Sequence, residues 1–136
     1  MILLDTNAVI AVLNDRPLVV REKLKAVLES GERVVISTLV VFELRYGAER
    51  SAHPDRNHSR IDDFLAGPLE VLPFTSDDAA AAGTIRAYLA GKGTPIGPFD
   101  VLIAGQARAR GLPIVTANTG EFERVPGLDV RNWTAP

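Results

Sequence analysis

Three acidic residues, Asp5, Glu43 and Asp100, lie in apolar surroundings where a carboxylate is unusual. Asp5 ends a short apolar run of strand-like length, whereas Glu43 and Asp100 each interrupt an apolar segment with helical spacing. A carboxylate in such a setting loses hydration, which is costly unless the charge is paired. Carboxylates that converge also repel one another, and a hard divalent cation removes that cost. Because only oxygen ligands are on offer, the pattern predicts a site for Mg²⁺, or for Mn²⁺.

Each of these acids also has a purely structural explanation. Asp5 would serve as a helix N-cap. Asp100 would be a first-turn acid that interacts favourably with the helix dipole. Glu43 would pair with Arg45 or Arg50. These explanations account for one acid at a time, whereas a metal site accounts for all of them together.

The elements that must position these acids alternate along the chain between strands and helices. We expect strands at Met1–Leu4, Val34–Ile36, Leu69–Phe74, Ile114–Thr116 and Leu128–Val130. We expect helices at Ala8–Leu13, Leu18–Leu28, Leu39–Ala48, Ile61–Leu65, from Thr75 to about Leu89, and at Phe99–Arg110. Ser37 or Thr38 would cap the third of these helices. The polar stretch Arg50–Ser59, which holds His53 and His58, is predicted to be a surface loop.

This alternation predicts a single α/β domain over residues 1–136, with a mainly parallel central sheet and helices on both faces. In such sheets the functional site lies beyond the carboxyl ends of the strands. The segments Asp5–Asn7, Ser37–Thr38 and Thr116–Asn118 fall at those ends. Most other acids, including Asp77 and Asp78, are expected on solvated faces or in helix caps.

Composition narrows the class of protein. The chain has 136 residues, a net charge of −2 and no cysteine, which excludes disulfides and thiolate metal sites. No apolar run approaches the roughly 20 residues that span a bilayer, and the N-terminus does not resemble a signal peptide. We therefore expect a cytoplasmic protein without membrane contact. The charge balance is not typical of nucleic-acid-binding proteins, which are usually basic.

Four blocks in this order make the sequence similar to VapC-type PIN domains. The blocks are Ile2–Asn7, Ser37–Gly47, Pro98–Ala104 and Ile114–Phe122, and the closing Val125–Trp133 also resembles that family. The resemblance runs nearly end to end and implies a PIN-like ribonuclease fold.

The resemblance also implies roles for individual residues. Asp5, Glu43 and Asp100 match the acidic triad of the family and would be the catalytic metal ligands. Thr6 or Thr116 would help to orient them. The family often has a fourth acid after the fourth strand, where this chain has Asn118 and, three residues later, Glu121. Asn118 would hold a metal-bound water or Glu121 would supply the charge; alternatively, either residue caps the short turn before Phe122.

The activity implied by the resemblance is Mg²⁺-dependent hydrolysis of an RNA phosphodiester by the toxin of a type II toxin–antitoxin system. Transfer RNA, such as the initiator tRNA cut in its anticodon loop, is one substrate that relatives suggest. A VapB-like antitoxin would lay its C-terminal segment along the groove beside the Leu39–Tyr46 helix and place an Arg near the acids. A homodimer is also implied. RNA would need basic contacts, for which the candidates are Arg45, Arg86, Lys92, Arg108 and Arg110. The Arg50–Arg60 stretch would be a partner-binding or dimer-edge loop.

Other readings compete with this one. A haloacid-dehalogenase-like phosphatase also opens with an Asp after strand one, but it needs a second Asp where this chain has Asn7. A receiver-like signalling domain needs an early acid pair, and the pairs Asp62-Asp63 and Asp77-Asp78 follow no early strand. A PIN fold kept only as a binding module, without catalysis, is a third alternative, although all the triad positions still carry acids.

Overall fold

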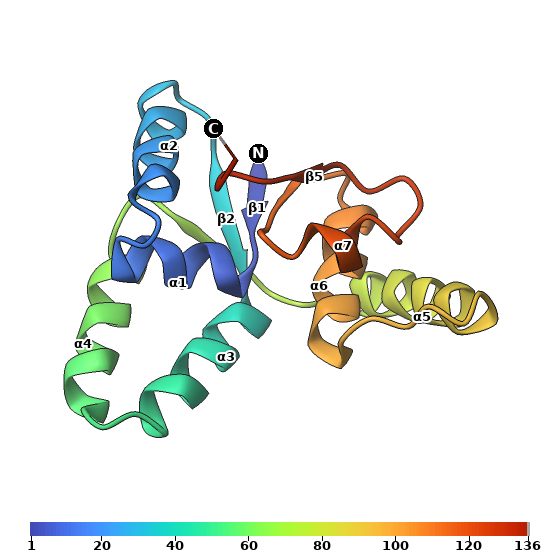
Figure 1. Cartoon of the computed structure of the whole chain (residues 1–136), viewed down its shortest axis with the longest axis horizontal. Helices are drawn as coiled ribbons and strands as arrows, with labels where there is room; N and C mark the ends of the chain where they lie inside the picture. Colours follow the sequence, from blue (N-terminus) through green and yellow to red (C-terminus); the bar gives the residue numbers. More distant parts are fainter. Residues whose placement is uncertain (136) are drawn as a thin grey trace.

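A computed structural model describes residues 1–135 of the chain (Figure 1). The strands are β1 (Ile2–Leu4), β2 (Val34–Ser37), β3 (Glu70–Leu72), β4 (Ile114–Val115) and β5 (Val130–Arg131). The helices are α1 (Thr6–Asn14), α2 (Leu18–Glu29), α3 (Thr38–Glu49), α4 (Pro54–Leu65), α5 (Ser76–Gly91), α6 (Pro98–Ala109) and α7 (Thr119–Phe122). The predicted alternation of strands and helices is confirmed, with boundaries that differ by a few residues.

The strands form one parallel sheet in the order β3-β2-β1-β4-β5. The chain moves outward from β1 to β2 and β3 and then returns to the other side of β1 to form β4 and β5. Because crossovers between parallel strands are right-handed, this reversal places α1–α4 on one face of the sheet and α5 and α6 on the other. Figure 1 shows these two groups of helices on opposite sides of the strands. The carboxyl ends of β1 and β4 thus form a topological switch point, where ligands of such folds bind.

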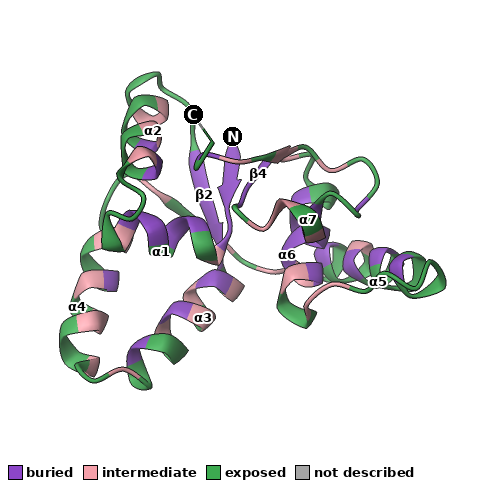
Figure 2. Ribbon diagram, viewed as in Figure 1, coloured by how far each residue is buried: buried purple, intermediate pink, exposed green. Residues whose placement is uncertain are grey.

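The core lies around the central strands. Every residue of β1, β2 and β4 is buried, as the purple strands of Figure 2 show. This burial explains why these strands are continuously apolar rather than alternating, since helices cover both faces of the sheet. The outer strands β3 and β5 are partly exposed. No helix within residues 1–135 is long and apolar enough to cross a membrane.

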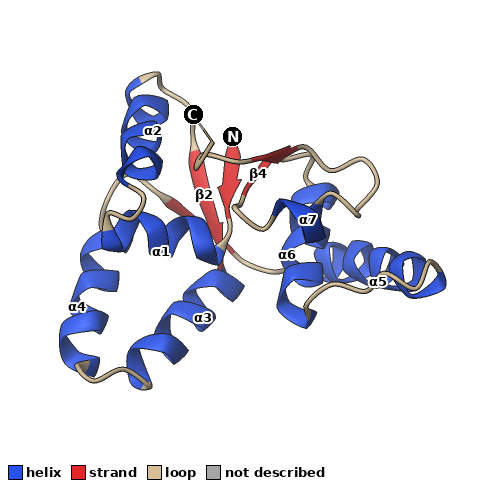
Figure 3. Ribbon diagram, viewed as in Figure 1, coloured by secondary structure: helices blue, strands red, loops and turns tan. Residues whose placement is uncertain are grey.

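The predicted loop at Arg50–Ser59 is wrong, because helix α4 begins at Pro54 (Figure 3). Its starting signals are Pro54 in the first turn and Asp55 near the positive end of the helix. The stretch is polar because it forms the solvent-facing side of an amphipathic helix whose residue Ile61 is buried. His53 is exposed as expected, but His58 is partly buried and hydrogen-bonds to Glu49 (2.9 Å).

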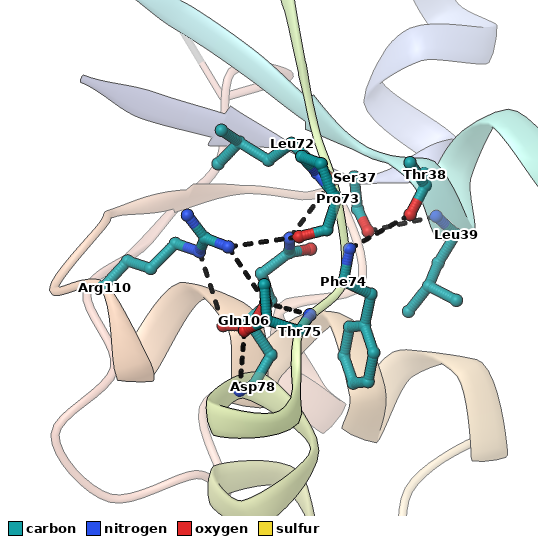
Figure 4. A network of polar contacts seen from close by, with 10 residues as sticks. All are labelled: Ser37, Thr38, Leu39, Leu72, Pro73, Phe74, Thr75, Asp78, Gln106 and Arg110. Atoms are coloured by element: carbon teal, nitrogen blue, oxygen red, sulfur yellow. Dashed lines mark hydrogen bonds and ion pairs between the residues drawn. The ribbon is translucent and has the colours of Figure 1, made fainter.

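A polar network fastens the turn between β3 and α5 to two other helices (Figure 4). The Thr38 hydroxyl at the start of α3 accepts a hydrogen bond from the Phe74 N–H (3.2 Å). From α6, the Gln106 amide donates to the carbonyls of Leu72 (3.3 Å) and Pro73 (3.2 Å). The same turn therefore holds both α3, which carries Glu43, and α6, which carries Asp100.

Asp78 belongs to this network and is not on a solvated face as expected. Its side chain is 1% exposed, and it forms a capping box with Thr75 at the start of α5. Arg110 donates to both of its carboxylate oxygens, at 3.3 and 3.1 Å. Burial by itself would raise the pKa of Asp78, but the hydrogen bonds from Arg110 and Thr75 outweigh burial and hold the pKa below its usual 3.8.

Replacing Arg110 by Met should lower the free energy of unfolding at pH 7 by about 1–2 kcal/mol, because a buried carboxylate loses its partner while water still reaches part of the site. Since the folded pKa of Asp78 is depressed, its contribution is present above pH 3.8 and is lost as the pH falls through the folded value. Denaturant unfolding of both proteins should thus show a gap at pH 7 that narrows below about pH 4. Arg108→Met, on the same helix but exposed, is the matched control. An equal loss in both variants would show that the Asp78 pair is not the cause.

Candidate active site

Asp5 lies at the carboxyl end of β1, between α1 and β4. Its Oδ1 accepts a hydrogen bond from the Ala8 N–H (2.8 Å), so it does cap α1, as its structural explanation predicted. Register places Leu4 opposite Val115, which brings Thr116 alongside Asp5 at the next step. Burial raises the pKa of Asp5 to about 6, against hydrogen bonds from Thr116 and Ala8, and the Glu43 charge raises it further. At 2% exposure, this carboxyl is held in place but is poorly solvated.

Glu43 reaches the same region from the second turn of α3. The Ser37 side chain caps this helix by accepting from the Leu39 N–H (3.0 Å), which fixes where the helix starts. Glu43 Oε1 accepts a 2.6 Å hydrogen bond from the Thr6 hydroxyl. Arg45 and Arg50, its two proposed partners, instead hydrogen-bond to Asp62 and to Tyr46. Thr6 therefore orients Glu43, while Thr116 orients Asp5.

Asp100 enters from the first turn of α6 on the opposite side of the switch point. Burial raises the pKa of Asp100 to about 7, and hydrogen bonding to Glu121 together with the charges of Glu121, Asp5 and Glu43 adds to the rise. Gly97 precedes this helix, and a Cβ there would lie 3.1 Å from Asp100 Oδ2. The approach of the chain to Asp100 therefore leaves little room for a side chain at residue 97.

Asn118 and Glu121, the two candidates for the family's fourth acid, lie next to Asp100. The Asn118 amide donates to Glu121 Oε2 (2.6 Å) and to Asp100 Oδ2 (3.4 Å). Hydrogen bonds from Asn118 and Asp100 lower the pKa of Glu121. Asn118 occupies the N-cap position of α7, but its side chain makes no capping hydrogen bond. Its side chain instead links the two carboxylates.

The electrostatics of the site are unbalanced. Within residues 1–135, Asp5, Glu43 and Asp100 form no ion pair with a basic side chain. Their charges act on one another, as the raised pKa values of Asp5 and Asp100 show. Across the same described residues, however, no three acids or histidines are grouped closely enough to enclose one ion by themselves. The arrangement can therefore attract a cation, and it leaves part of the coordination sphere to water or substrate.

The predicted basic contacts are less well placed than the acids. Arg45 and Arg110 are engaged by Asp62 and Asp78, and Lys92 lies 5.6 Å from the ring centre of Tyr88. Arg86 and Arg108 are exposed. Sequence reasoning missed the network around Gln106, although a Gln within the apolar run of α6 was a visible signal of a buried polar contact.

Comparison with known proteins agrees with this geometry. A family model for the PIN domain matches residues 2–128. The tRNA(fMet)-specific endonuclease VapC of Shigella flexneri is 46% identical over 132 residues, which cover 97% of each chain. Its namesake from Salmonella typhimurium is 44% identical over 131 residues, or 96% of each chain. The crystal structure of VapBC2 from Rickettsia felis bound to a promoter DNA fragment matches with a TM-score of 0.90 and 35% identity, covering 98% of this chain and 99% of that one.

Proposed function

Because the chain belongs to the PIN domain family, and within it to the VapC ribonucleases, we propose that Asp5, Glu43 and Asp100 are the catalytic residues of a Mg²⁺-dependent endoribonuclease. One observation carries this assignment. Three carboxylates from β1, α3 and α6 meet at the switch point of the sheet, raise one another's pKa values and have no basic partner among residues 1–135. Such an arrangement is unfavourable for stability alone and favourable for holding a cation.

The donor set fits Mg²⁺. VapC nucleases of the PIN type are generally dependent on a divalent metal. Mg²⁺ is usually bound by one or two carboxylates, several waters and a substrate phosphate, rather than by a closed cage of protein ligands. A cluster of acids that does not close around one point matches that habit, and Mn²⁺ would bind the same oxygens. When bound, the metal supplies an activated water and stabilises charge on the scissile phosphate.

The remaining residues of the site act by holding these acids. Asp5 and Asp100 would be the most direct ligands, with Glu43, fixed by Thr6, holding a second ion or orienting water. Thr116 keeps Asp5 in place from β4. Asn118 supports the proposal that Glu121 contributes the fourth negative charge, since its amide ties Glu121 to Asp100. The pKa of Glu121 is lowered, so this carboxylate is ionised when Asp100 is still protonated.

The biological setting follows from the relatives. Two are called tRNA(fMet)-specific endonucleases, and we extend that substrate to this chain, with the anticodon loop as the site of cleavage. The Rickettsia structure is a VapBC complex, so we assign this chain a VapB-like antitoxin as partner. The unpaired acids support an antitoxin Arg as the inhibiting group, because a guanidinium binds carboxylates bidentately. A homodimer completes the proposal, and sedimentation of the purified protein tests it.

The metal is tested by cleavage and by melting. Purified protein should cleave initiator tRNA in Mg²⁺ or Mn²⁺ and stop in EDTA. Millimolar Mg²⁺ should also raise the melting temperature, because the ion binds only the folded site. The rise should be larger at pH 8 than at pH 6, since Asp5 and Asp100, with pKa values of about 6 and 7, must lose protons to bind the metal.

The same melting experiment on Asp100→Asn should show no rise with Mg²⁺. A folded wild-type protein that binds RNA but neither responds to metal nor cleaves would instead identify a PIN fold kept as a binding module.

A further inference from the structure

Two exposed phenylalanines meet across the mouth of the acid cluster. Phe42, on α3, and Phe99, on α6, have ring centres 5.3 Å apart and ring planes inclined by 32°. Their exposed fractions are 51% and 39%. They come from segments more than fifty residues apart in the sequence, so their contact is a product of the fold.

Their position is tied to the acids. Phe42 immediately precedes Glu43, and Phe99 immediately precedes Asp100. Figure 1 shows the first turns of α3 and α6 on either side of the carboxyl end of β1, where Asp5 lies. The phenylalanine pair, defined as Phe42 and Phe99, is therefore part of the rim of the candidate active site.

We propose that the phenylalanine pair is a stacking platform for an unpaired nucleobase next to the scissile phosphate; this inference rests on the ribonuclease function proposed above. A nucleotide whose phosphate lies at the acids must place its base within one sugar of that point. The exposed ring faces of the pair are the aromatic surface available there. Base–aromatic stacking is the usual way in which proteins hold unpaired bases.

The charge of the protein favours stacking over phosphate contacts as the source of affinity. The net charge is −2, and the site itself is rich in carboxylates that repel a phosphate in the absence of metal. Arg45 and Arg110 are engaged by other acids. Neutral contacts to the base are not opposed by that charge. The platform would also select loops over duplexes, since paired bases are already stacked on their neighbours.

The test is a cycle that combines a protein variant with an RNA variant. The probe is the anticodon stem-loop of initiator tRNA, after the cleaved bond has been mapped with wild-type protein. In two further RNAs an abasic nucleotide replaces the residue on one or the other side of that bond. We expect Phe42→Ala and Phe99→Ala to lower kcat/KM on intact RNA by about 5- to 100-fold. On one of the abasic RNAs, the same substitutions should cost less than about twofold, because the stacked base is already missing.

Controls separate stacking from folding and from assembly. Phe42→Trp should keep activity on intact RNA, and Tyr88→Ala, which removes another exposed aromatic residue on α5, should leave it unchanged. Melting temperature and sedimentation are measured for each variant. The inference is overturned if Phe42→Ala cleaves intact RNA at the wild-type rate, including when it loses only antitoxin binding. It is also overturned if the loss is equal on intact and both abasic RNAs, or if it follows dissociation of a dimer.

A binding measurement distinguishes failure of this inference from failure of the ribonuclease proposal. Anisotropy of the labelled stem-loops is measured in EDTA, where no metal-dependent cleavage occurs. If wild-type protein binds intact RNA better than one abasic RNA, and Phe42→Ala removes that preference, the platform stands even when no cleavage is found in Mg²⁺. If cleavage occurs but the preference is absent, the platform is wrong and the ribonuclease proposal stands.

Discussion

Asp5→Asn is expected to abolish RNA cleavage while making the metal-free protein more stable. Cleavage is lost because the substitution removes a charged oxygen from the proposed metal site. The α1 cap survives, since Asn is as good an N-cap as Asp and can accept the Ala8 N–H bond. A folded Asp5→Asn protein that cleaves at the wild-type rate would remove Asp5 from the mechanism.

The gain in stability should depend on pH in a defined direction. The folded pKa of Asp5 is raised from 3.8 to about 6. The stability of the wild-type protein is thus unaffected by this group below pH 3.8 and falls as the pH rises through about 6. A shift of that size corresponds to about 3 kcal/mol, of which Asn should recover about 1–2 kcal/mol because it makes weaker hydrogen bonds.

Denaturant unfolding in EDTA at pH 4 and pH 8 measures this effect. The variant and the wild type should differ little at pH 4 and most at pH 8. Asp63→Asn is the control, since Asp63 is exposed on α4 and should change neither cleavage nor the dependence of stability on pH. A variant less stable than wild type at pH 8 would mean that the Asp5 carboxylate is a structural cap and not a strained ligand.

Gly105→Ala is expected to produce the largest loss of stability among single methyl additions. Helices α5 and α6 pack so closely that a Cβ on Gly105 would lie 2.5 Å from the Ala82 Cβ and 2.6 Å from the Ala82 Cα and N. Backbone atoms cannot give way as a flexible side chain can, so the helices must separate. We expect a loss of about 2–3 kcal/mol, which lowers the melting temperature by on the order of 10 °C.

The matched control is Gly83→Ala on α5, where an added Cβ meets nothing within 4 Å. That variant should be more stable than wild type by up to about 1 kcal/mol, because Ala is the better helix former. Cleavage should fall in Gly105→Ala even below its melting temperature, since α6 carries Asp100 toward the other acids. If the two variants melt alike, α5 and α6 are not in close contact at Gly105.

The local patterns of the sequence were sufficient for the class of fold and for the acids of the candidate site. Apolar runs bounded by caps and glycines mark strands and helices because burial and capping act over a few residues. Asp5 was recognisable because it ends a strand whose residues are all buried. The ends of parallel strands share one edge of the sheet, so the placement of Asp5 and Thr116 followed from strand direction alone.

Amphipathic elements with long polar faces were harder to recognise. Helix α4 was predicted as a loop because most of its first turns face water, and its buried face becomes visible only when α3 and α1 are in place. Asp78 was expected in solvent for the same reason: its partner Arg110 is thirty-two residues away in the sequence. Pairs of this kind leave no periodic signal, because neither residue is unusual in its own segment.

The sequence by itself therefore determined which residues could ligate a metal and that they follow strands or lie in apolar helices. Only the tertiary structure decided which of them meet and what surrounds them. Asn118 joins Glu121 to Asp100, Thr6 holds Glu43, and two phenylalanines meet at the rim. The physical reason is that periodicity and capping are local properties of the chain, whereas these contacts depend on the order of the strands and on how closely the helices pack across them.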